Sequence, residues 1–182
     1  MFIYTELTPN PSSLKFVLDE IILEEGVADF PDAESAKGNS QLAERLYRYP
    51  FTQGVFIGRN FITLTKDDNA QWNDVIPVIK AEIQKFFEAG LPVLENVQVT
   101  PKFLGTSDIE QKIIQVIEEQ VRPAVAMDGG DIIYEGFDDG IVKLKLRGSC
   151  SGCPSSSMTL KHGIQSLLIR LFPEHVKAVE AI

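Results

Sequence analysis

The chain has only two cysteines, Cys150 and Cys153, and they lie two residues apart in the stretch "RGSCSGCPSS" at residues 147–156. Two thiols at this spacing can form a redox-active disulfide, half of a zinc site or half of an iron–sulfur site. Gly, Ser and Pro flank them, which is typical of a functional loop and not of inert thiols packed in a core. The search for this protein's chemistry therefore starts at these residues.

Zinc is the first metal to consider, because a structural zinc ion needs four ligands and the chain offers two thiols and two imidazoles. His162 lies nine residues after Cys153, on an expected helix, and His175 lies near the start of the last expected strand. Neither spacing matches that of a zinc finger. Zinc bound within one chain is therefore disfavoured.

Two alternatives remain open for the cysteine pair. A strand, C-x-x-C and a helix in that order are the local plan of thioredoxin-like proteins, but here an antiparallel hairpin precedes the motif and only one helix and one strand follow. An iron–sulfur cluster is held by four thiolates, so a complete site would need two chains related by a two-fold axis. A cluster bridging two exposed loops could leave when the chains separate, which suits a carrier.

Thiolates at this position are expected to be stabilised by positive charge. The cysteines enter a helix, whose N-terminal amides and dipole favour anions. Lys143, Lys145 and Arg147 on the preceding strand, and Lys161 on the following helix, are expected to add to this effect.

The elements that position the motif form a second block of the chain. "SDIE" is a capping box in which Ser107 caps a helix and Glu110 reaches back. The helix is expected to stop near Pro123, and its apolar face consists of Ile109, Ile113, Val116, Ile117 and Val121. Residues 128–131, "DGGD", are expected to form a turn and not a metal or phosphate site.

A hairpin, a helix and a strand complete this block. Two β-rich runs flank "DDG", where Gly140 can take positive φ, and Leu144 and Leu146 are expected on the face opposite the basic side chains. A helix is expected to begin at Pro154. Its apolar stripe consists of Leu160, Ile164, Leu167, Leu168 and Leu171. With a closing strand in residues 175–182, the order is α-β-β-α-β.

The first block is a separate α/β unit. Strands are expected at residues 2–7 and 14–18, a loop at 26–39, and a short helix capped by Ser40 with Leu42 and Leu46 on one face. "GVFIG" and "FITLTK" indicate a hairpin, and a helix is expected from Trp72 to Ala89, with Pro77 tolerated if it lies in the first turn.

Residues 91–106 carry no helical period and contain two prolines, which is typical of a linker. We therefore expect two small two-layer domains of the α/β (α+β) class: residues 1–90, a linker at 91–106, and residues 107–182.

Composition and the absence of certain motifs exclude several classes of function. The formal charge of −9 disfavours nucleic acids and anionic membranes as partners, and no apolar run approaches the ~20 residues of a membrane span. No P-loop, Ser/His/Asp grouping or pair of carboxylates suggests an enzyme. The first residues carry no signal- or transit-peptide pattern, which favours a reducing compartment: bacterial cytoplasm or, alternatively, the mitochondrial matrix.

Residues 127–168, "MDGGDIIYEGFDDGIVKLKLRGSCSGCPSSSMTLKHGIQSLL", closely resemble the C-terminal domain of NifU and the Nfu proteins. "TPNPSSLKF", "GVFIGRNFITLTK" and the Trp-containing segment after them resemble the N-terminal domain of Nfu proteins. Together the two resemblances cover nearly the whole chain.

The resemblance implies a scaffold or carrier, not an enzyme, that binds a [4Fe-4S] cluster shared between two subunits. By this resemblance Cys150 and Cys153 are the cluster ligands and the cluster-bound form is a homodimer. Its implied partners are apo iron–sulfur client proteins and upstream cluster assembly proteins. A thiol–disulfide redox protein using the same pair is the alternative.

Overall fold

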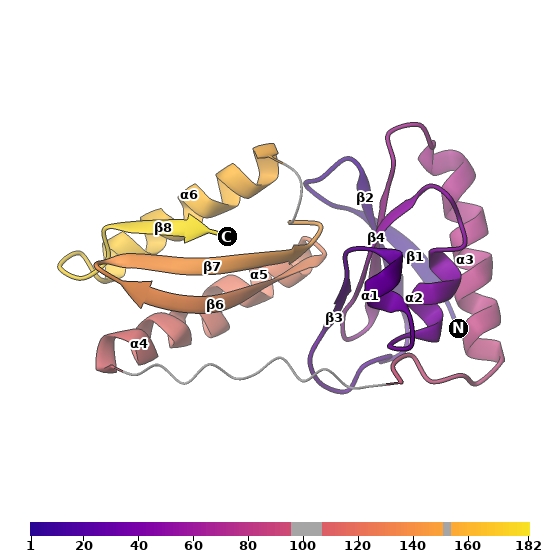
Figure 1. The fold of residues 1–182 in the computed structure, drawn as a ribbon, viewed down its shortest axis with the longest axis horizontal. Helices are drawn as coiled ribbons and strands as arrows, with labels where there is room; N and C mark the ends of the chain where they lie inside the picture. The colour runs from indigo at the N-terminus through magenta and orange to yellow at the C-terminus, as the bar shows by residue number, and fades with distance from the viewer. Residues whose placement is uncertain (96–106, 151–153) are drawn as a thin grey trace. The chain divides into compact units, whose positions relative to one another are not determined.

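The computed structural model describes residues 1–95, 107–150 and 154–182, with the backbone alone for residues 154–157 (Figure 1). The chain divides into two compact units, Met1–Thr100 and Pro101–Ile182. Each unit combines a β-sheet with helices, which confirms the expected α+β class. Across the described ranges, no helix is long and apolar enough to cross a bilayer.

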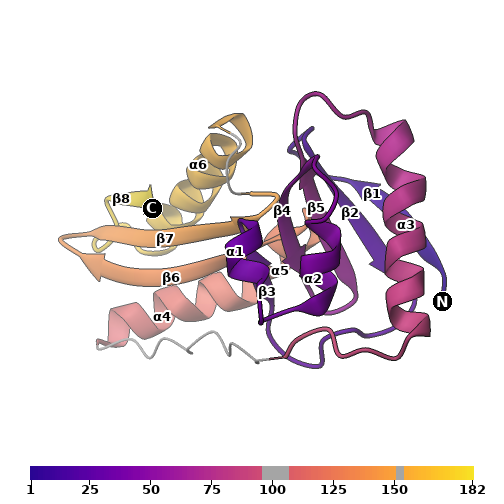
Figure 2. The same ribbon diagram turned by 45° about the vertical axis from the view of Figure 1, so that its right-hand side comes forward.

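The first unit is built on a five-stranded antiparallel sheet with the order β1-β2-β5-β4-β3 (Figure 2). Its strands are β1 (Ile3–Leu7), β2 (Ser13–Leu18), β3 (Ala28–Phe30), β4 (Thr52–Ile57) and β5 (Phe61–Lys66). The strands expected near residues 2–7 and 14–18 and the hairpin are confirmed.

Three helices of this unit share one core with the sheet: α1 (Ala33–Ala36), α2 (Gln41–Leu46) and α3 (Trp72–Glu88). Ser40 caps α2 as expected, because its hydroxyl accepts the Ala43 N–H at 3.2 Å. Apolar side chains at helical spacing on α3 meet those of alternate strand positions, which fixes the sheet face that the helix covers. The fully buried members of this core include Phe16, Leu42, Leu46, Ile62, Ile79, Ile83 and Phe86.

One expectation for the first unit is wrong, and the helix expected from Trp72 to Ala89 forms although its condition on Pro77 is not met. Residues 26–39 are not a loop, because Ala28 and Phe30 pair with β4 and are buried, and Asp32 caps α1. The strand is only three residues long, so its sequence carries no alternating pattern to recognise. Pro77 lies in the second turn of α3 and not in the first, at an exposed position.

The second unit has the expected order α-β-β-α-β. A helical run of α4 (Asp108–Val116), η1 (Ile117–Val121) and α5 (Arg122–Met127) is followed by β6 (Gly130–Asp138), β7 (Ile141–Gly148), α6 (Pro154–Leu171) and β8 (Ala178–Ala181). The sheet order is β6-β7-β8, with β8 parallel to β7 (Figure 1). Helices and sheet enclose one core, which includes Ile113, Val125, Ile132, Leu144 and Leu168.

The first helical run does not stop near Pro123, as expected, but continues to Met127. Pro123 has no N–H for the carbonyl four residues earlier, and its ring would crowd that carbonyl. One π-helical turn, η1, precedes it, and the Arg122 N–H donates to the Ile117 carbonyl five residues back. The wider turn accommodates the proline without ending the helix.

Three local expectations are confirmed. Ser107 and Glu110 form the capping box, the hairpin turns at Asp139 and Gly140 with positive φ at both residues, and α6 starts at Pro154. Leu171 is an exception on the expected apolar stripe, because it is 43% exposed at the end of α6.

The beginning of the expected linker contacts the first unit. Val93 is buried in that unit's core, and the Ser40 hydroxyl donates to the Val93 carbonyl at 2.6 Å. Residues 96–106 of the linker lie outside the described residues.

Candidate functional site

Cys150 lies in the turn between the end of β7 at Gly148 and the start of α6 at Pro154. It carries a free thiol, is only 5% exposed and belongs to the buried core of the second unit. Cys153, the second expected ligand, lies outside the described residues. The motif thus occupies the strand-to-helix position that the sequence indicates, with one of its thiols held against the core.

The "DGGD" stretch lies next to Cys150, with Asp128 and Gly129 in a turn and Gly130 and Asp131 at the start of β6. Gly130 lies opposite Gly148 in the β6–β7 register. A Cβ atom on Gly130 would lie 2.6 Å from the Arg147 carbonyl oxygen and 2.9 Å from the Cys150 Sγ. Contacts this short are not tolerated, so this position requires glycine to let the two backbones and the thiol approach.

Ser149 joins the Cys150 segment to Asp128 and Gly129 by hydrogen bonds. Its hydroxyl donates to the Asp128 carbonyl, and its N–H donates to the Gly129 carbonyl at 3.2 Å. The Ser149 oxygen also lies 3.7 Å from the Cys150 sulfur. These bonds satisfy polar groups that burial would otherwise leave unpaired, and they fix the backbone that presents the thiol.

An ion pair anchors the turn from the other side. Asp131 is buried, and its Oδ1 lies 3.0 Å from Arg122 Nε, although the N–H direction is too poor for a hydrogen bond. Arg122 also donates to the Ile132 carbonyl at 2.9 Å and contacts Glu118 at 2.5 Å. One guanidinium therefore joins the helical run to the first strand of the sheet beside Cys150.

The electrostatics at Cys150 differ from the expectation of a stabilised thiolate. Burial raises the pKa of the Cys150 thiol, and the charges of Asp128 and Asp131 raise it further, against a lowering by the side-chain hydrogen bond with Ser149. The expected basic side chains do alternate with Leu144 and Leu146 along β7, but the charges that act on the pKa of this thiol are those of the two carboxylates. Reactive redox cysteines have a lowered pKa, and the surroundings of Cys150 act in the opposite direction.

The histidines do not join Cys150. His162 is exposed on α6, and His175 lies beyond the opposite end of that helix. In the part of the chain that the structure describes, no three His, Cys, Asp or Glu side chains are grouped so that they could hold a metal ion. A mononuclear zinc site is not assembled from these residues.

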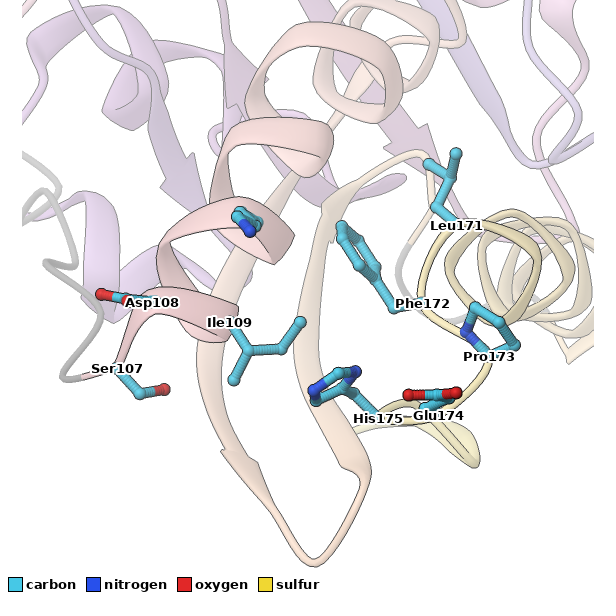
Figure 3. Close-up of a pocket in the computed structure, with 9 residues that line it drawn as sticks. Ser107, Asp108, Ile109, Leu171, Phe172, Pro173, Glu174 and His175 are labelled. Atoms are coloured by element: carbon cyan, nitrogen blue, oxygen red, sulfur yellow. The ribbon is translucent and has the colours of Figure 1, made fainter.

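A hollow of about 660 Å³ lies at the far end of α6 from the cysteines (Figure 3). Figure 3 shows Ile109 of α4 facing Phe172 across it, with His175 below them. Its lining residues are Ser107, Asp108, Ile109, Lys112, Leu171, Phe172, Pro173, Glu174 and His175. Because an 18-residue helix is about 27 Å long, this hollow is separate from the cysteine turn.

Sequence reasoning missed the supporting residues Gly130, Ser149 and Arg122. The paired glycines at 130 and 148 were a usable signal, because glycines facing each other near a hairpin end indicate a close approach. No comparable signal marks Arg122, whose partners are far from it in the sequence.

Two family models match the chain. The model "Scaffold protein Nfu/NifU N terminal" matches residues 3–90, and the model "NifU-like domain" matches residues 113–180.

Curated relatives match over the full length of the chain. The human "NFU1 iron-sulfur cluster scaffold homolog, mitochondrial" is 45% identical over 100% of this chain and 72% of its own length. "NifU-like protein 4, mitochondrial" of Arabidopsis thaliana is 44% identical over 99% of this chain and 65% of its own length. A solution NMR structure of a NifU-like protein from Saccharomyces cerevisiae is 27% identical over 53% of this chain and 87% of that one, with a TM-score of 0.44.

Proposed function

Because the chain belongs to the Nfu/NifU family of iron–sulfur cluster scaffold proteins, we propose that two copies hold a [4Fe-4S] cluster between them through Cys150 and Cys153 and deliver it to apo-proteins. The family is one of scaffolds and not of enzymes. The cluster is cargo in this function, so the chain's task is to hold it and to release it.

The observation that carries the proposal is the number of thiols and the position of one of them. The chain has two cysteines, whereas a cluster of this type takes four thiolates. Cys150 is presented by a braced strand-to-helix turn, and no grouping of three possible ligands occurs among the described side chains. A second copy is the simplest source of the two missing thiolates.

The residues around Cys150 suit a site that must be rigid before the cluster arrives. Ser149 and Gly130 fix the backbone next to Cys150, and Arg122 holds Asp131 beside it. A backbone that is already fixed at Ser149 and Cys150 reduces the entropy that has to be lost when the Cys150 thiol binds iron. Ligand exchange with an acceptor protein can then proceed without refolding of the unit.

The test of ligation is anaerobic reconstitution with iron and sulfide. We expect about four irons and four sulfides per dimer, and loss of the cluster in either Cys150→Ala or Cys153→Ala. The His162→Ala/His175→Ala double variant is the matched control and should keep full cluster content. A monomer that retains all of its iron would contradict the shared cluster.

The test of delivery separates a carrier from a redox protein. The loaded protein should transfer its cluster to an apo [4Fe-4S] acceptor, and the iron-free protein should show negligible disulfide reductase activity. The opposite pattern of activities would support the thiol–disulfide alternative.

We further infer that cluster assembly proteins supply the cluster and that the chain works in a reducing compartment, the bacterial cytoplasm or the mitochondrial matrix. The two curated relatives described above are both named as mitochondrial. Free thiols persist in either compartment.

A further inference from the structure

The outer edge of the first unit's sheet is formed by β1. It pairs with β2 on one side, and no described residue pairs with its other side (Figure 2). The Asp19 N–H donates to the Phe2 carbonyl at 3.2 Å, so Phe2 directs its backbone oxygen toward β2. Since backbone direction alternates along a strand, Tyr4 and Glu6 also face β2.

The remaining residues of β1, Ile3, Thr5 and Leu7, therefore direct their N–H and C=O groups away from the sheet. The neighbouring ladder agrees with this assignment, because the Leu18 N–H donates to the Asn60 carbonyl on the β5 side. The Val17 amide, one residue earlier, thus faces Tyr4, its partner in the register. The edge offers three donors and three acceptors in a row.

This edge is unusually apolar for one that is left open. Of the ten exposed large hydrophobic side chains among the described residues, four are Met1, Phe2, Tyr4 and Leu7, and Leu7 is 88% exposed. Proteins usually protect an open edge with lysine, proline or a bulge. Residues 3–7 contain no proline, their one charged side chain, Glu6, is paired with Lys15 of β2 at 3.0 Å, and their pairing with β2 has no register shift.

We propose that β1 pairs with β1 of a second copy of this chain, in antiparallel orientation, to form a continuous ten-stranded sheet. In the proposed register the two-fold axis passes through Thr5. Thr5 then faces Thr5 of the second copy, and Ile3 faces the partner's Leu7. All three outward-facing residues of each strand make backbone hydrogen bonds, and each exposed Leu7 side chain packs on an isoleucine.

Self-complementarity selects both this partner and this register. With the axis at Thr5, each Glu6 lies opposite the partner's Tyr4, whose hydroxyl can donate to the carboxylate. An axis at Glu6 would place two carboxylates opposite each other, which is unfavourable. An axis at Tyr4 would leave Leu7 beyond the end of the partner's strand. Only the Thr5 register uses the whole of Ile3–Leu7 in both copies.

This contact does not involve the cysteines, so it operates with or without a cluster. It keeps two chains together while they are empty. Holding two copies together raises the effective concentration of one cysteine turn for the other, which favours assembly of a shared site.

Disulfide cross-linking in a Cys150→Ala/Cys153→Ala background tests the register. One preparation carries Tyr4→Cys and a second, distinguishable by mass, carries Glu6→Cys. Tyr4 and the partner's Glu6 would be directly opposed and not hydrogen-bonded, a pair whose Cα atoms lie about 4.5 Å apart, within the reach of a disulfide. The two Tyr4 residues, or the two Glu6 residues, would be diagonal neighbours about 7–8 Å apart, too far for a disulfide.

Mild oxidation should therefore cross-link the mixture and not either preparation alone. Cross-linking of Tyr4→Cys with itself, or no cross-linking in the mixture, would overturn the proposal. These variants bind no cluster, so failure here is distinct from failure of the proposed function.

A second measurement uses the cysteine-free protein and sedimentation over a range of concentrations. Leu7→Lys places a charge on the edge and should weaken the dimer by at least about tenfold, without a cost in folding because the side chain is exposed. Val78→Lys, on α3 and also exposed, is the matched control and should leave the dimer unchanged. A monomer at all concentrations, or equal effects of both variants, would show that β1 is not the interface.

Discussion

The position beside the thiol is occupied by Gly130, whose lack of a side chain lets β6 approach both the Arg147 carbonyl and Cys150. The geometry of the site therefore depends on the absence of a side chain at residue 130. Gly136 is also on β6, where the register shifts between Tyr134 and Gly136, and a Cβ atom added to it would have no neighbour within 4 Å. The two glycines of one strand are therefore suited to a direct comparison.

We predict that Gly130→Ala lowers the free energy of unfolding by about 1–3 kcal/mol, because the new methyl group overpacks the turn. It should also lower the cluster content after anaerobic reconstitution. Gly136→Ala should change neither quantity. Thermal unfolding of the iron-free protein and iron analysis of the loaded protein measure the two effects, and equal behaviour of both variants would contradict the role of Gly130.

Tyr134 gives a prediction about pH. Its hydroxyl donates to the buried Glu110 at 2.9 Å, and burial first, then this hydrogen bond and the carboxylate charge, raise the pKa of the phenol. The unfolded phenol has a pKa of about 10. Because the folded pKa is the higher one, the stability that this phenol contributes is fully present below pH ~10 and is lost as the pH rises above it.

Tyr134→Phe should therefore cost about 1–3 kcal/mol at neutral pH, since Glu110 loses a donor, and should flatten the fall in stability above pH ~10. Chemical unfolding between pH 7 and 11 checks both parts, and an unchanged slope would refute the assignment.

At the scale of the element, the helical run of the second unit is held in register with the sheet by Arg122. The π-helical turn that accommodates Pro123 precedes Arg122 directly, and the guanidinium then reaches Asp131 and the Ile132 carbonyl at the start of β6. Asp131 is only 4% exposed, and Arg122 lies 3.0 Å from its carboxylate.

Arg122→Met should destabilise the protein by about 3–5 kcal/mol, because it leaves the Asp131 carboxylate buried without a counter-charge. The double variant Arg122→Met/Asp131→Asn should recover part of this loss. Glu118→Gln, which breaks the more exposed pair of the same arginine, should cost at most about 1 kcal/mol. Denaturant unfolding of the four proteins distinguishes a buried ion pair from a surface one, and equal costs would contradict it.

At the scale of the whole molecule, the two units have separate buried cores. The larger and smaller clusters of the first unit draw on residues up to Leu94, and the core of the second unit begins at Ile109. Each unit thus has the apolar interior that independent folding requires.

We predict that a fragment of residues 107–182 folds cooperatively by itself and assembles a cluster in the same ratio of iron to cysteine as the full chain. Circular dichroism on heating and anaerobic reconstitution are the measurements. A folded fragment that assembles no cluster would show that the first unit helps to build the site.

The sequence by itself determined the elements whose signals are local. The Ser107–Glu110 capping box, the Asp139–Gly140 turn and the apolar stripe of α3 each lie within one turn or one helical face, so neighbouring residues suffice to define them. The sequence also identifies the two cysteines, their spacing and their place between a strand and a helix, because these features are local as well.

Tertiary structure decided what depends on distant partners. β3 exists because Ala28 and Phe30 find β4, although three residues carry no pattern of their own. Pro123 stays within a helix because packing on both sides of it outweighs a local signal to stop. The pKa of Cys150 is raised because folding buries the thiol near Asp128 and Asp131, whereas the nearby sequence showed basic residues. Burial and through-space charge arise only once the chain has folded, and a single sequence records neither.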